Sequence, residues 1–94
     1  MPSYLVETFL ARGATDERAR RERQASLAAE SLTREGTRVR FGGSIHVPDD
    51  EICFFSFEAP TGRAATLVAE RAGLKDFRVV EVDGSMESSP TTST

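Results

Sequence analysis

The chain is poor in the side chains that build covalent cross-links and metal cages. Its 94 residues include one cysteine, Cys53, and one histidine, His46. A single cysteine excludes a disulfide within the chain and a metal cage built from cysteines alone, and it fits a reducing cytoplasm. The sequence also lacks zinc-ligand spacing, a phosphate-binding glycine loop and a nucleophile elbow. We therefore expect no metal site and no cofactor.

Long apolar runs and an excess of basic charge are missing as well. A membrane-spanning helix needs about 20 apolar residues, and the longest apolar stretches here are far shorter. The net charge is −3, whereas nucleic-acid binding requires a basic patch. We expect a cytoplasmic protein with no nucleic-acid or membrane partner. The arginine run is interpreted as a solvated helix face, because acidic neighbours offset it; it comprises Arg18, Arg20, Arg21 and Arg23.

Hydrophobic periodicity and turn residues predict six elements in the order βαββαβ. The expected strands are Tyr4–Leu10, Arg38–Val47, Ile52–Glu58 and Phe77–Val82, and the expected helices are Thr15–Glu35 and a second one that begins after Thr61 and ends at Gly73. This order is typical of a ferredoxin-like α+β sandwich, with a four-stranded antiparallel sheet and two helices on one face. The domain is expected to span residues 1–83. Residues 84–94, of which seven are Ser or Thr, are expected to form a disordered tail.

Local signals mark the ends of these elements. Thr15 and Thr61 are suited to cap the two helices at their N-termini, and Gly36 and Gly73 suit the position just beyond their C-termini. Gly42-Gly43 interrupts the alternation of the second strand, which predicts a β-bulge or a close approach to the backbone.

The third predicted strand, Ile52–Glu58, is apolar on both faces. Because side chains alternate along a strand, Cys53 and the phenylalanines of the same parity should face the helices, where Cys53 would be a buried structural thiol. Phe54 then points to the other face, which a second copy of the chain, a ligand or both should cover. Parity assigns to this face Leu5, Glu7, Phe9, Arg40, Ser44, His46, Phe54, Ser56, Glu58, Val79 and Glu81. A bulge at Gly42-Gly43 would reverse part of the second strand.

Candidate catalytic residues lie in this set. His46 is a candidate general base oriented by a carboxylate, and the alternative is an exposed histidine at a strand end. Glu7 and Glu58 can meet across the first and third strands, where two close carboxylates would raise one pKa; alternatively, Glu58 pairs with Arg40 or Arg78. The candidate ligand-binding residues are Arg40 for a carboxylate or enolate oxygen, Phe54 as an apolar wall, Ser44 and Glu81.

Three short motifs resemble those of a known family. They are Tyr4-Leu5-Val6-Glu7, Phe57-Glu58-Ala59-Pro60, and the ending from Glu70-Arg71-Ala72-Gly73-Leu74 to Val79-Val80-Glu81-Val82. The resemblance covers Pro2 to Asp83 and is to a family of small, mostly actinobacterial domains of unknown function whose best-known relative binds nickel. It implies a ferredoxin-like homodimer, forming a dimeric α/β-barrel-type assembly. The nickel-binding relative is rich in histidine and this chain has one, so nickel binding is not carried over and no metal ligand is assigned.

Two functions remain open from the sequence. The first is a homodimer that binds a small ligand or a metal ion between facing sheets. The second is a cofactor-independent cyclase, isomerase or oxygenase acting on a small organic substrate of secondary metabolism. The enzyme hypothesis requires His46, or a glutamate of raised pKa, inside a closed pocket.

Overall fold

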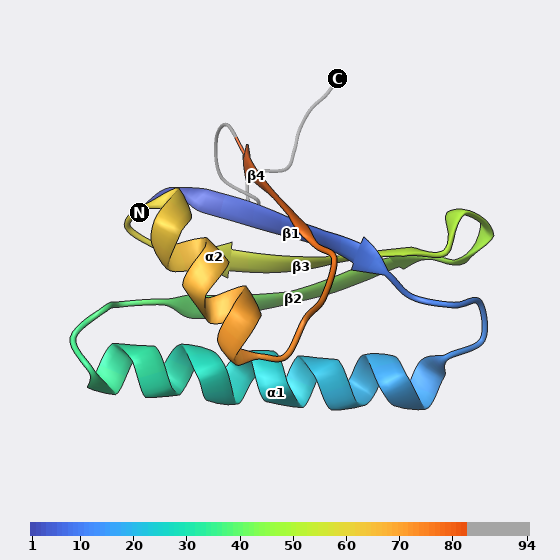
Figure 1. The fold of residues 1–94 in the computed structure, drawn as a ribbon, viewed down its shortest axis with the longest axis horizontal. Helices are drawn as coiled ribbons and strands as arrows, with labels where there is room; N and C mark the ends of the chain where they lie inside the picture. Colours follow the sequence, from blue (N-terminus) through green and yellow to red (C-terminus); the bar gives the residue numbers. More distant parts are fainter. Residues whose placement is uncertain (83–94) are drawn as a thin grey trace, which may run out of the picture.

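The computed structural model describes residues 1–82, in which four strands and two helices follow one another in the predicted βαββαβ order (Figure 1). The elements are β1 (Ser3–Phe9), α1 (Thr15–Arg34), β2 (Arg40–Val47), β3 (Ile52–Glu58), α2 (Gly62–Arg71) and β4 (Arg78–Val82), with a short 3-10 turn, η1 (Pro48–Asp50), between β2 and β3. The predicted strand limits lie within two residues of these. The expected tail at 84–94 lies outside the described residues.

The strands form one antiparallel sheet in the order β2-β3-β1-β4. Both helices pack on the same face, with α2 across the sheet and α1 along its β2 side (Figure 1). The chain therefore adopts the ferredoxin-like α+β fold. Neither helix in this part of the chain combines the length and the apolar character of a membrane span.

The core lies between the helices and one face of the central strands. Val6 of β1 and Cys53, Phe55 and Phe57 of β3 are fully buried there. The helices contribute mainly small side chains, which allow close packing on the sheet: Ala25, Ala28 and Ala29 from α1, and Ala64, Ala65 and Ala69 from α2. Burial of large side chains from the sheet against alanine stripes supplies most of the apolar contact in this thin domain.

The two helices begin differently. The hydroxyl oxygen of Thr61 accepts a hydrogen bond from the backbone N–H of Ala64 (3.1 Å), which confirms the predicted cap of α2. Thr15, in contrast, is already the first residue of α1, and Ala14 occupies the capping position without a side-chain hydrogen bond. The prediction that Thr15 caps α1 is wrong, because the preceding turn brings the chain into the helix one residue earlier.

Both helices end on the predicted glycines. Gly36 and Gly73 have φ values of +107° and +83°, in the left-handed region. After α2, the N–H of Leu74 bonds to the carbonyl of Ala69 and that of Gly73 to Glu70, the pattern of a Schellman motif. These reversals send the chain back to the sheet after each helix.

The predicted bulge is present in β2. Phe41 lies opposite Phe57, but the next paired residue is Gly43, opposite Ser56. Gly42 is therefore the extra residue, and every later side chain of β2 points to the face opposite to that expected for an uninterrupted strand.

Candidate functional site

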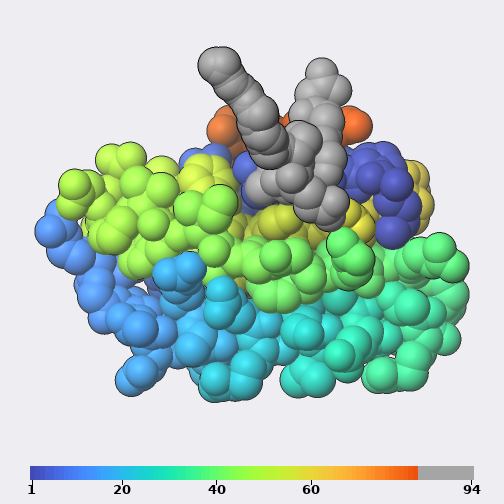
Figure 2. Space-filling view, turned by 180° about the vertical axis from the view of Figure 1, so that it is seen from behind, coloured from blue at the N-terminus to red at the C-terminus, as the bar shows by residue number. Residues whose placement is uncertain are grey.

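The sheet face away from the helices, here called the open face, is arranged in four cross-strand rows. From β2 to β4 they read Arg40–Glu58–Ser3–Val82, Gly43–Ser56–Leu5–Val80, Ile45–Phe54–Glu7–Arg78 and Val47–Ile52–Phe9. Figure 2 views the molecule from this side, with β2 and β3 in green and yellow above α1. Three apolar side chains are largely exposed: Phe9 at 61%, Ile45 at 52% and Val80 at 39%.

The two candidate carboxylates do not meet. Glu7 lies opposite Phe54, whereas Glu58 lies opposite Ser3. The two glutamates are thus four residues apart along the strands, about 13 Å. The predicted Glu7–Glu58 pair is wrong. Side-chain parity indicates which face of the sheet a residue lies on, but it does not determine which residues of β1 and β3 lie opposite one another.

Each glutamate instead has its own arginine. Glu7 accepts a hydrogen bond from Arg78 Nη2 at 3.1 Å. Glu58 lies 3.4 Å from Arg40 Nε, which confirms the alternative pairing predicted for Glu58. The open face therefore carries two separate ion pairs, and their four charges sum to zero.

His46 and Ser44 lie on the helix side of the sheet, not on the open face. His46 is opposite Cys53, and its Nε2 lies 3.2 Å from the carbonyl oxygen of Leu10. Ser44 is opposite the buried Phe55. The prediction that these two residues share a face with the glutamates is wrong, because the bulge at Gly42 reverses this half of β2.

The side chains of β4 also face the opposite way from the prediction. Val79 and Glu81 lie opposite Val6 and Tyr4, two buried residues on the helix side. Val80 is the residue of β4 that reaches the centre of the open face. The assignment of Val79 and Glu81 to the open face is therefore a register error of one residue.

Four of the seven candidate site residues remain together on the open face: Glu7, Arg40, Phe54 and Glu58. They place the half-buried ring of Phe54 in the row of the Glu7–Arg78 ion pair, two rows from the Arg40–Glu58 pair. This arrangement can bind a molecule with an apolar body and polar ends. It does not bring a histidine and a carboxylate together within one protomer.

Behind β2, a polar cluster joins the sheet to α1. Arg18 donates from Nε to the Ser44 hydroxyl (2.9 Å) and from Nη2 to the Ser44 carbonyl (3.0 Å). The Ser44 hydroxyl in turn donates to the Glu22 carboxylate. Arg18 is thus half-buried against the sheet (side chain 35% exposed) and not part of a fully solvated face.

Cys53 lies beneath this cluster and is completely buried. Burial raises the pKa of its thiol, an effect that the nearby charge of Arg18 opposes. The prediction that Cys53 is buried and faces the helices is confirmed. An inaccessible thiol of raised pKa is not suited to nucleophilic chemistry.

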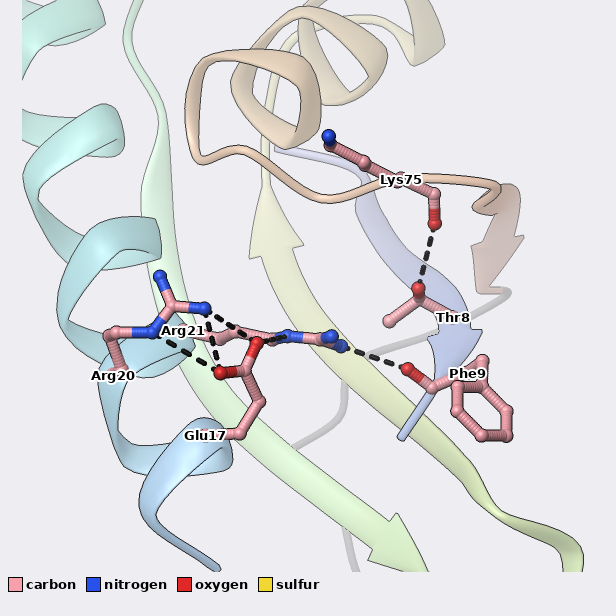
Figure 3. Close-up of polar contacts among 6 residues, drawn as sticks. All are labelled: Thr8, Phe9, Glu17, Arg20, Arg21 and Lys75. Carbon is pink, nitrogen blue, oxygen red and sulfur yellow. Dashed lines mark hydrogen bonds and ion pairs between the residues drawn. The ribbon is translucent and has the colours of Figure 1, made fainter. Parts of the chain in front are cut away.

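A second polar site, which we name the α1–loop cleft, was missed from the sequence (Figure 3). It has a volume of about 270 Å³ and lies between the first turns of α1, the end of β1 and the loop from α2 to β4. Its charged side chains are Glu17, Arg20, Arg21, Lys75 and Asp76. The signal available in the sequence was the i, i+3 and i, i+4 spacing of Glu17 with Arg20 and Arg21.

Hydrogen bonds order one wall of this cleft. Glu17 accepts from Arg20 Nη2 (2.7 and 2.6 Å to its two oxygens) and from Arg21 Nε (2.7 Å). The hydrogen bonds from Arg20 and Arg21 hold the pKa of Glu17 below its usual value. On the opposite wall, the Thr8 hydroxyl donates to the carbonyl of Lys75 at 3.0 Å.

A surface groove of about 420 Å³ lies between the second half of α1 and the start of β2. Its apolar lining residues are Ala29, Val39 and Phe41, and its charged residues, Glu30, Arg34 and Arg40, are exposed. Within residues 1–82, no three histidine, cysteine, aspartate or glutamate side chains gather closely enough to hold a metal ion.

The fold and the open face define a ferredoxin-like α+β domain with one sheet face uncovered by its own helices. Comparison of the chain with protein-family profiles, with curated proteins and with solved structures found no match.

Proposed function

We propose that the protein is a homodimer that binds a small, partly apolar molecule between two facing open faces. The observation that carries this proposal is the exposure of Phe9, Ile45 and Val80 on one side of the sheet. The opposite side is closed by two helices over fully buried side chains. Exposed apolar side chains distributed over one sheet face favour an interface over contact with solvent.

The charges of the open face favour a second copy of the same chain as its partner. Arg40 and Arg78 are matched by Glu58 and Glu7 on the same face. Two copies can therefore approach without net repulsion, and each guanidinium can find a carboxylate on its partner. A nucleic acid would instead require a face of positive charge.

The dimensions of the face predict a dimer of moderate affinity. Strands about 4.8 Å apart, with a rise of about 3.3 Å per residue, give four strands of seven residues a footprint of roughly 19 by 23 Å. Two such faces bury at least on the order of 900 Å², which is below the roughly 1,200–2,000 Å² of a stable complex and in the range of weak or transient ones. Dissociation is therefore expected in the micromolar range.

The ligand would lie where the open face has its smallest side chains. Gly43 and Ser56 are neighbours in one row, flanked by Ile45 and Phe54 in the next. A Cβ atom added at Gly43 would meet nothing within 4 Å. In a face-to-face dimer such a row leaves space between the sheets, with apolar walls and with the Ser56 hydroxyl available to bind a polar atom of the ligand.

Binding is proposed in place of catalysis because of where the candidate catalytic groups lie. The enzyme hypothesis required His46, or a glutamate of raised pKa, inside a closed pocket. His46 lies on the helix side, and the glutamates are separated and paired with arginines. The open face thus retains groups that orient a ligand, without a general base beside them.

Analytical ultracentrifugation across the micromolar range tests the dimer. We expect a monomer–dimer equilibrium for the full chain and a shift to monomer for Phe54→Asp and Ile45→Asp, because each places a charge in an apolar interface. Leu27→Asp is the matched control, since Leu27 is 63% exposed on α1. A chain that stays monomeric throughout the range, or a control that dissociates equally, would refute the proposal.

Ligand binding is then measured with anilinonaphthalene sulfonate, a probe with apolar rings and one anionic group. Saturable binding with a fixed stoichiometry per dimer is expected for the wild-type protein, and Ser56→Phe should abolish it by filling the space beside Gly43 while the dimer persists. Unchanged probe binding by Ser56→Phe would show that the probe binds elsewhere and would contradict a ligand-binding space at the Gly43–Ser56 row.

A further inference from the structure

We propose that the α1–loop cleft is a second binding site, which takes the carboxylate or phosphate group of a small molecule. Three cationic side chains, Arg20, Arg21 and Lys75, line a cleft of about 270 Å³. Arg20 and Arg21 belong to α1 and Lys75 to the loop between α2 and β4, segments distant in sequence that lie on either side of the cleft in the folded chain (Figure 3). The cleft is built on the helix side, so this inference does not depend on the function proposed for the open face.

The arginines are held in place before any ligand binds. Arg21 donates from Nε to Glu17 (2.7 Å) and from Nη1 to the carbonyl of Phe9 (2.9 Å), and its side chain is only 22% exposed. Arg20 donates from Nε and Nη2 to the same carboxylate. Guanidinium groups that are already ordered lose little conformational entropy when an oxyanion binds.

These bonds leave donors unused. A guanidinium carries five N–H groups. Among residues 1–82, Arg21 makes no hydrogen bond from Nη2. Within the same residues, the hydrogen-bond partner of Arg20 Nη1 is Gln24, whose amide oxygen can accept from it at 3.2 Å. Both side chains line the cleft, so the remaining N–H groups are available to a ligand oxygen.

The local charge favours an anion within an acidic protein. Glu17 and Asp76 offset two of the three cations, which leaves the cleft with a charge of +1 in a chain whose net charge is −3. Glu17 also occupies donors that an external oxyanion would otherwise take. Moderate affinity is therefore expected, and removal of the Glu17 charge should tighten binding.

The volume limits the size of the ligand. Pockets for drug-sized ligands measure about 300–1,000 Å³, and this cleft lies just below that range. A molecule of a few carbon atoms with one or two oxyanion groups fits. Inorganic phosphate and succinate are suitable probes of the two chemistries.

Heteronuclear NMR titration of the full chain with sodium phosphate and with sodium succinate, at constant ionic strength, tests the site. Saturable shifts are expected for the backbone amides of Gly73, Lys75 and Asp76. The probe that saturates at the lower concentration identifies the preferred oxyanion. Lys75→Gln should weaken binding several-fold, and it keeps the main-chain carbonyl that Thr8 binds.

Two further variants sharpen the test. Glu17→Gln should tighten binding several-fold, an outcome that an internal salt-bridge network with no ligand would not produce. Arg23→Gln removes one positive charge, as Lys75→Gln does, but from an exposed position of α1 that does not line the cleft. It should leave binding unchanged. Shifts that fail to saturate with either probe, or an equal loss in Arg23→Gln, would overturn the proposal.

Discussion

Gly42 lies so close to Ser56 that a Cβ atom at position 42 would stand 3.0 Å from the Ser56 hydroxyl oxygen. This contact occurs at the bulge, beside Gly43 with its φ of +125°. The bulge determines that Ile45, and not His46, reaches the open face. Two glycines thereby control the composition of the proposed interface.

The two glycines are expected to differ in their tolerance of a side chain. Gly43→Ala should lower the free energy of unfolding by about 1–3 kcal/mol, because its φ is one that only glycine adopts without strain. Gly42→Ala should cost less, since the obstructing atom is a hydroxyl that can rotate, and adding Ser56→Ala should recover part of that loss. Urea denaturation measures all three variants. A larger cost for Gly42→Ala than for Gly43→Ala would contradict this geometry.

The contact between Arg18 and Ser44 is expected to stabilise the packing of α1 on β2. A double-mutant cycle with Arg18→Ala and Ser44→Ala should give a coupling free energy of about 1 kcal/mol, because a charged, half-buried donor is involved. Chemical denaturation of the four proteins provides the values. The same cycle with Arg23→Ala in place of Arg18→Ala should give a coupling near zero, and equal coupling in both cycles would argue against a specific contact.

Stability should depend on pH through Glu17. The hydrogen bonds from Arg20 and Arg21 lower the pKa of Glu17 in the folded protein relative to the value of 4.5 for an unperturbed glutamate. The stabilisation is therefore present above that unfolded-state value and is lost as the pH falls through the lower, folded-state pKa.

The wild-type protein should thus exceed Glu17→Gln in stability most at neutral pH, and the difference should shrink below pH 4.5. Urea denaturation over a pH series measures it. Glu30→Gln, at an exposed position of α1, serves as the control. A difference that does not change with pH would show that the carboxylate of Glu17 does not stabilise the fold through its charge.

Cys53 should be protected from thiol reagents in the native protein. It is completely buried, and burial raises its pKa, so little thiolate forms and none is accessible. Reaction with an aromatic disulfide reagent should be orders of magnitude slower in buffer than in denaturant, at a rate governed by opening of the fold. Rapid stoichiometric reaction of the folded protein would contradict the burial of this side chain.

Much of the fold could be predicted because its signals are local. Gly36 and Gly73 end helices through backbone conformations available to glycine, and Thr61 caps α2 through a bond to a residue three positions away. The alternation along Ile52–Glu58 likewise predicted that Cys53, Phe55 and Phe57 face the helices, where they are buried. The α1–loop cleft could not be predicted, because the loop that carries Lys75 is brought to the same cleft as Arg20 and Arg21 only by tertiary packing.

By itself the sequence determined the order of the elements and the positions of the turns, which depend on residues close together in the chain, and strand alternation predicted which face Cys53 lies on. Only the tertiary structure decided which side chains share a face. Strand side chains repeat every two residues, so the single extra residue at Gly42 moved His46 to the helix side, and an offset of one residue in β4 exchanged Glu81 for Val80. Long-range strand pairing and packing determine the register. The register in turn determines which functional groups each face of this sheet presents.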